Sequence, residues 1–102
     1  MTTVARYGKA IAHNGQGGAL AGHLLGAAED LAADPGCLLY LINREKSDPD
    51  TIWVTEVWRS QADLDASLRR IRGSDRVAAV MALVRDWQMI ELEPLGGKGP
   101  GG

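Results

Sequence analysis

The fold is decided by two apolar stretches on either side of a turn: residues 37–44, CLLYLINR, and residues 51–58, TIWVTEVW. Both stretches are short, and the second is rich in β-branched and aromatic residues. The turn residues 47–50, SDPD, separate them. Short apolar runs bounded by turn residues are typical of strands, so this part of the chain predicts a β-hairpin.

Both alternating faces of this hairpin carry apolar side chains. Cys37, Leu39 and Leu41 alternate with Leu38, Tyr40 and Ile42, and Trp53 and Val57 alternate with Ile52, Val54 and Trp58. A sheet with one solvated face would alternate apolar with polar residues. We therefore expect helices to cover one face and a second copy of the chain to cover the other, which predicts a homodimer.

The segments around the hairpin predict the order β-α-β-β-α-α-β. Leu and Ala recur at helical spacing before Asp34-Pro35-Gly36, and Ser60 and Ser74 are candidate N-caps for two further helices. The expected elements are strands over 4–12, 37–44, 51–58 and 88–93, and helices over 19–33, 60–72 and 75–87. The last of these helices carries an apolar stripe that runs through Val84 to Trp87. Such an order indicates an α+β, ferredoxin-like fold with an antiparallel sheet.

The chain has room for one domain, because it is 102 residues long. We assign that domain to residues 1–95. The remainder, residues 96–102, reads GGKGPGG and cannot pack a core, so it is expected to be a flexible tail.

Charge and composition narrow the classes of partner and compartment. The formal net charge is −2 with both signs interspersed, so no basic stripe indicates nucleic acid as a partner. The longest apolar run, residues 78–84, is far shorter than the ~20 residues of a membrane span, and the first residues contain no apolar signal core. One cysteine, Cys37, permits no internal disulfide, and the chain is expected to be cytoplasmic.

Three segments resemble the antibiotic-biosynthesis-monooxygenase family: residues 35–40 (PGCLLY), 48–58 (DPDTIWVTEVW) and 60–68 (SQADLDASL). The resemblance extends from Tyr7 to Leu92, and its strongest parts are the Pro-Gly-Cys strand start and the Glu-x-Trp strand end. It implies a dimeric α+β barrel in which each monomer holds a cavity between sheet and helices. It also implies oxidation of phenols, anthrones or quinols with O₂, without flavin, metal or haem. A related branch of the family binds and degrades haem.

Glu56 and Trp58 are the first candidates for a site. Trp58 stands where the family has an aromatic residue, on the same strand face as Val54 and Glu56, so Val54 and Trp58 are expected to contact substrate. The alternative is that Trp58 only packs the sheet against the helices. A buried Glu56 could serve as the base that ionises the substrate. The alternative for Glu56 is an ion pair with an arginine such as Arg44 or Arg85.

Further candidates lie outside the hairpin. His23 stands between Leu20 and Leu24 on the first expected helix and is the second candidate for a base, unless it is solvated. Tyr7 could orient a phenol. Met81 and Trp87, on the last expected helix, could roof the cavity or belong to an ordinary core stripe.

Several positions depart from the family pattern. Relatives that oxygenate often have an asparagine where Val54 or Glu56 stands. Many members have a histidine where this chain has Ser67, and the haem-degrading branch has an asparagine where Gly8 stands. No Cys/His cluster has the spacing of a metal site, so no metal or other cofactor is expected.

The sequence therefore favours a cofactor-independent monooxygenase that acts on a small aromatic substrate, such as a quinol or an anthrone, with O₂. The alternative is a non-oxygenating protein of the same fold that binds or cyclises a small molecule, or an accessory protein. A haem protein is a weaker alternative, because no histidine stands at the positions the haem branch uses.

Overall fold

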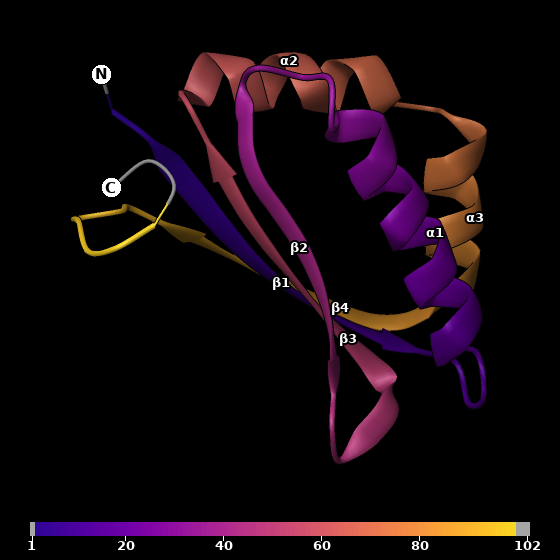
Figure 1. Ribbon diagram of the computed structural model, residues 1–102. Helices are drawn as coiled ribbons and strands as arrows, with labels where there is room; N and C mark the ends of the chain where they lie inside the picture. The colour runs from indigo at the N-terminus through magenta and orange to yellow at the C-terminus, as the bar shows by residue number, and fades with distance from the viewer. Residues whose placement is uncertain (1, 100–102) are drawn as a thin grey trace.

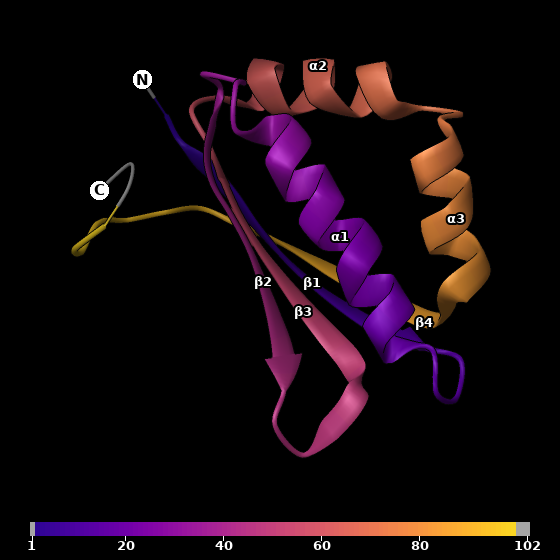
Figure 2. The same ribbon diagram turned by 45° about the vertical axis from the view of Figure 1, so that its right-hand side comes forward.

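The computed structural model describes residues 2–99 and contains a four-stranded antiparallel sheet with three helices. The strands are β1 (Val4–Ala12), β2 (Cys37–Glu45), β3 (Asp48–Trp58) and β4 (Val84–Leu92), in the order β2-β3-β1-β4. The helices are α1 (Gly17–Leu31), α2 (Gln61–Ile71) and α3 (Asp75–Leu83). All three helices lie on one side of the sheet (Figures 1 and 2). The α+β, ferredoxin-like arrangement expected from the sequence is thus confirmed.

The hairpin is longer and its turn tighter than expected, because β2 continues to Glu45 and β3 already begins at Asp48. Asp50, near the start of β3, holds the beginning of α1. Its two carboxylate oxygens accept hydrogen bonds from the backbone N–H groups of Gly15 and Gly17, each at 2.9 Å. A Cβ atom at Gly17 would collide with the backbone carbonyl oxygen of Pro49, so only glycine permits this close approach.

Both predicted serine N-caps are confirmed. The Ser60 hydroxyl accepts a hydrogen bond from the backbone N–H of Asp63 at 3.1 Å, and the Ser74 hydroxyl accepts one from Val77 at 3.2 Å. Each hydroxyl satisfies one of the backbone donors that have no partner within the first turn of a helix.

The expected helix over 75–87 is wrong at its end. The helix α3 ends at Leu83, and residues 84–92 form β4, so Val84 and Trp87 belong to a strand. Val84 still donates its N–H to the carbonyl of Val80, but its own backbone is extended. From this point the chain pairs with β1, where Ala10 lies opposite Trp87. The edge of β1 offers a full ladder of backbone hydrogen bonds, which a longer α3 would leave unpaired.

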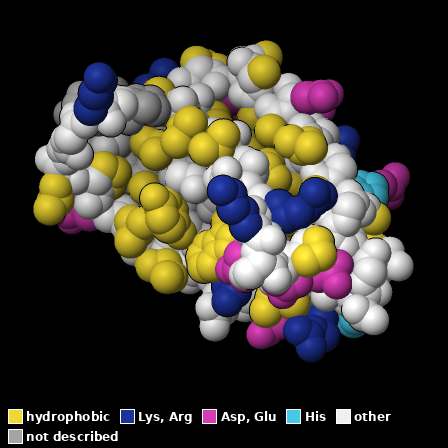
Figure 3. Space-filling model, turned by 60° about the horizontal axis from the view of Figure 1, so that its bottom comes forward, with side chains coloured by type: hydrophobic (Ala, Val, Ile, Leu, Met, Phe, Trp, Pro, Cys, Tyr) yellow, Lys and Arg dark blue, Asp and Glu magenta, His cyan; other side chains and the backbone are white. Residues whose placement is uncertain are grey.

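Alternation along the strands gives the sheet two distinct faces. The helix face carries Ala10 and Ala12 of β1 with Ile52 and Val54 of β3, and these four pack against Leu20, Ala21 and Leu24 of α1 as the core. The open face, which no helix covers, carries Tyr7, Leu41, Ile90 and Leu92, and all four are exposed. Figure 3 shows many apolar side chains on the left half of this view, whereas most of its charged side chains lie on the right half.

Candidate functional site

A row of polar side chains crosses the helix face of the sheet. Arg6 on β1 lies opposite Glu56 on β3, and Glu56 in turn lies opposite Tyr40 on β2. Glu56 is only 5% exposed, and its nearest neighbours on this face of β3, Val54 and Trp58, are apolar. A carboxylate buried in this way requires partners, because removing a charge from water costs several kcal/mol.

Two side chains supply those partners. The indole Nε1–H of Trp58 donates to Glu56 Oε1 at 2.9 Å, and one terminal nitrogen of Arg6 lies 3.5 Å from Glu56 Oε2. Trp58 is 1% exposed, so the ring packs between the sheet and the helices while its single polar atom is satisfied by Glu56. The structure therefore brings Glu56 and Trp58 together, as the alternation in β3 predicted.

The ion pair of Glu56 is formed with a different arginine from those we named. Its partner is Arg6, and neither Arg44 nor Arg85 takes part. Arg6 is fifty positions away in sequence but is the direct cross-strand neighbour of Glu56. The sequence contained a signal: Arg6 precedes Gly8, Ala10 and Ala12 at every second residue, which places it on the face of the small core side chains.

Burial and the charge of Glu56 also raise the pKa of two side chains on β2, Tyr40 and Cys37. Burial raises the pKa of the Tyr40 phenol, and the neighbouring Glu56 raises it further. Burial likewise raises the pKa of the Cys37 thiol, with smaller contributions from Glu56 and Asp34. Both groups therefore stay protonated at neutral pH, so they can donate hydrogen bonds but do not act as bases.

The other candidate residues, Val54 and His23, do not belong to this row of polar side chains. Val54 is on the same strand face, but it is packed into the core against α1. His23 is half-buried on α1, and its backbone carbonyl accepts a hydrogen bond from Arg76 of α3 at 2.9 Å. Its role as a base stays a prediction.

Trp87, Met81 and Tyr7 are not gathered around Glu56 as expected. Trp87 is on the helix face of β4, where its ring and the end of Met89 lie over Gly8. Met81 is 62% exposed on α3, so it does not roof an enclosed space. Tyr7 projects from the open face, on the other side of the sheet from Glu56. A role for Tyr7 in the same site of one protomer is not supported by this placement.

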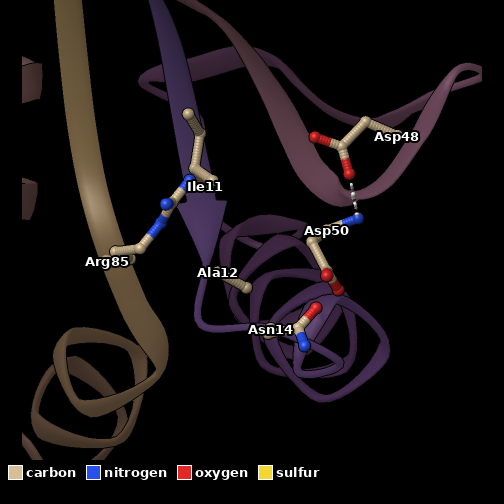
Figure 4. A pocket seen from close by; sticks show the side chains of 6 residues that line it. All are labelled: Ile11, Ala12, Asn14, Asp48, Asp50 and Arg85. Atoms are coloured by element: carbon tan, nitrogen blue, oxygen red, sulfur yellow. Dashed lines mark hydrogen bonds between the residues drawn. The ribbon is translucent and has the colours of Figure 1, made fainter.

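Two hollows are found elsewhere on the molecule. The first, of about 330 Å³, lies between the hairpin and the ends of β1 and β4 (Figure 4); it is lined by Ile11, Ala12, Asn14, Asp48, Asp50 and Arg85. Its carboxylates have structural partners. Asp48 accepts hydrogen bonds from Thr51 and from the backbone of Asp50, and these bonds lower its pKa. The second hollow, of about 460 Å³, lies on the open face beside Tyr7 and residues 93–99.

Within residues 2–99, no three His, Cys, Asp or Glu side chains are grouped as a metal ion would require. No helix in the same range is long and apolar enough to cross a membrane.

Comparisons with known proteins agree on one family. The model of the family described as "Antibiotic biosynthesis monooxygenase" matches residues 4–82. A protein of Chloroflexus aurantiacus assigned to the antibiotic biosynthesis monooxygenases is 36% identical, with a TM-score of 0.83 over 98% of this chain and 100% of that one. No curated protein matches the chain significantly.

Two more distant structures share the fold. Rv0793 from Mycobacterium tuberculosis is 22% identical, with a TM-score of 0.82 over 94% of this chain and 98% of that one. A variant of SnoaB, a cofactor-independent oxygenase from Streptomyces nogalater, is 15% identical, with a TM-score of 0.83 over 95% and 97% of the two chains. At these identities the likeness concerns the arrangement of the backbone.

Proposed function

Because the chain belongs to the antibiotic biosynthesis monooxygenase family, we propose that it is a cofactor-independent monooxygenase that oxidises a quinol, an anthrone or a related aromatic molecule with O₂. The observation that carries this proposal is the buried pair of Glu56 and Trp58, joined by a 2.9 Å hydrogen bond on the helix face. SnoaB, which has the same fold, is itself a cofactor-independent oxygenase, and this supports the reaction class.

Glu56 offers a carboxylate that can accept the phenolic proton. The indole of Trp58 is fully packed beside it and orients that carboxyl group through its Nε1–H. The resulting phenolate is electron-rich enough to pass an electron to O₂. One oxygen atom then enters the ring system, and the other leaves as water with the two hydrogens that the substrate loses. The substrate supplies all the electrons, so no external reductant is required.

The alternative of binding without oxidation draws support from Val54. This residue lies on the strand face beside Glu56 and is packed into the core, so it offers no hydrogen bond to a substrate or to reduced oxygen. A protein with such a site can bind a small aromatic molecule, as a cyclase or accessory protein would, and leave it unoxidised. Measured O₂ consumption separates the two functions.

We also propose that the working form is a homodimer in which a second copy covers the open face. The apolar side chains exposed there include Tyr7, Leu41, Ile90 and Leu92, which a monomer would leave in water. Two such sheets can pack face to face at about 10 Å. The Glu56 site lies on the opposite face, so each protomer keeps a complete row of polar residues.

The test is oxygen uptake with a panel of hydroquinones and anthrones, with chelator present and without added flavin or metal. Glu56→Gln should lower kcat by roughly 10² or more, because it removes the base. Trp58→Leu should also lower kcat, by a smaller factor, because it removes the indole N–H that orients the Glu56 carboxyl group. His23→Ala is the parallel variant, and a larger loss of kcat there than in Glu56→Gln would transfer the role of base to His23. If no compound is consumed faster than in buffer, the binding function replaces the oxygenase.

A further inference from the structure

Residues 93–99, which follow β4, stand beside the open face of the sheet. In Figures 1 and 2 they leave the end of β4 on the side of the sheet away from α1 and α3. The hollow of about 460 Å³ lies between these residues and the open face, where it is lined by Tyr7, Leu39, Val57 and Leu92. These four residues define the apolar half of the open face. Residues 93–99 are therefore adjacent to the apolar half without being packed down on it.

Leu95 projects into solvent from this segment. It is 93% exposed, although Pro94 and Gly96 on either side of it line the hollow. Gly96 and Gly97 have φ values of 154° and 113°, in the region that favours glycine, so the chain after Leu95 can change its conformation at little steric cost. A rotation that turns Leu95 into the hollow would remove both its side chain and the apolar wall of the hollow from water.

A second copy of the chain would use the same part of the face. Farther along the strands the open face is polar, because Lys9 Nζ lies 5.3 Å from the centre of the Trp53 ring and their cross-strand neighbours are Gln88 and Asn43. The apolar half is therefore the half that a second sheet gains most by covering. Two packed sheets lie about 10 Å apart, and their side chains fill that space. The backbone of residues 93–99 cannot remain between them.

We propose that residues 93–99 form a strap that closes over the apolar half of the open face and competes there with a second copy of the chain. This inference rests on the proposed homodimer and adds a means of regulating it. In the closed strap, Leu95 occupies the hollow and covers Tyr7. A second copy binds only a protomer whose strap has swung away, so the measured dissociation constant of the dimer rises with the fraction of closed straps. Because both protomers must open, closure acts twice on each dimer.

Assembly should respond to the loss of Leu95 or of the strap. Light scattering over a range of protein concentrations gives the dissociation constant of the dimer. Leu95→Ser and deletion of residues 95–102 should each lower this constant at least about tenfold, because fewer straps are closed. Leu25→Ser, at an exposed leucine of α1, is the matched control and should dimerise as wild type. An unchanged dimer in Leu95→Ser would overturn the proposal, and so would a weaker one, which would assign Leu95 to the contact with the second copy.

The closed strap can also be detected in the monomer, through Tyr7. The chain has two tyrosines, of which Tyr40 faces the helices and Tyr7 lines the hollow. N-Acetylimidazole acetylates accessible tyrosine hydroxyls, and the mass of the peptide that contains Tyr7 gives the rate. At a concentration at which light scattering gives the mass of the monomer, Leu95→Ser should be acetylated at Tyr7 at least about threefold faster than wild type. Leu25→Ser should again match wild type, and equal rates in all three proteins would show that no strap covers Tyr7.

The strap and the homodimer can fail separately. If every form is a monomer at all concentrations but acetylation of Tyr7 depends on Leu95, the strap stands and the second copy is lost as its competitor. If wild type is a dimer and neither assembly nor acetylation responds to Leu95, the homodimer stands and the strap is wrong.

Discussion

Cys37 shows at the scale of a single residue how the buried carboxylate alters its surroundings. This half-buried thiol lies opposite Trp58 in the register of β2 and β3, next to the Glu56 row. The thiolate is the reactive form, and a negative neighbour disfavours it. The thiol pKa is raised chiefly by burial and to a smaller extent by the charge of Glu56. A raised pKa makes the thiolate scarcer at any given pH below it.

We expect Cys37 to react with a disulfide reagent at about pH 8 at least roughly tenfold more slowly than in the unfolded chain. Glu56→Gln should increase the rate by a smaller factor, because it removes the charge and leaves the burial. Raising the pH should speed the reaction of the folded protein well beyond the point at which the unfolded chain reaches its plateau. Absorbance of the released thiol measures both rates. A folded protein that reacts as fast as the unfolded chain would contradict the assigned environment of Cys37.

The elements that could be predicted from the sequence are those specified by neighbouring residues. The hairpin strands follow from local alternation, and Ser60 and Ser74 mark helix starts by their own side chains. The boundary between α3 and β4 could not be found in this way, because β4 exists through its pairing with β1 at the other end of the chain. Local spacing in residues 77–87 suits a helix as well as a strand start.

The same distinction applies to the candidate site. Glu56 and Trp58 share a strand, so the period of two was enough to place them on one face. Arg6 and Tyr7 are neighbours on β1, and a shift of one residue decides which of them faces the helices. That choice depends on the register of β1 against β3, where Arg6 lies opposite Glu56. The small residues Gly8, Ala10 and Ala12 indicate the face on which Arg6 lies, but a single sequence contains no direct signal for the register that sets Arg6 opposite Glu56.

At the scale of one element, α3 should depend on its N-cap more than most helices do. It has nine residues, and none of them is buried. Ser74→Ala should lower the free energy of unfolding by about 1 kcal/mol, because the N–H of Val77 loses its acceptor. Ser74→Asp should retain most of the stability. Ser47→Ala, in the exposed hairpin turn, is the control and should change little. Chemical denaturation measures all three, and equal effects of Ser74→Ala and Ser47→Ala would rule out a contribution from the cap.

At the scale of the whole molecule, the open face of the sheet is the surface that the proposed homodimer would cover. A chain of 102 residues buries a smaller fraction of its surface than a larger protein does, so covering this face would add stability. The open face and the Glu56 row lie on opposite sides of the sheet. Changes that separate the protomers should therefore leave the polar row in place.

Light scattering should give twice the 10.9 kDa mass of the chain at micromolar concentration. Ile90→Lys should produce a monomer, because it places a charge on the open face at a side chain that is 55% exposed in one protomer. Leu25→Lys, at an equally apolar and 52% exposed position on α1, should leave the dimer intact. A monomeric wild type would remove the proposal, and a dimer that only Leu25→Lys disrupts would move the interface to the helices.

The pairing of the first strand with the last has a consequence for how the chain is made. Ala5 lies opposite Leu92, and β1 stands between β3 and β4 in the sheet. While the ribosome is still synthesising the protein, one edge of β1 therefore remains without a partner until the residues of β4 have been translated. Contacts between such distant parts of a chain require closure of a large loop, and proteins dominated by them fold in roughly milliseconds to seconds. The nascent chain thus completes its sheet only after β4 has left the ribosome, and until then β1 is an open edge to which other chains can pair.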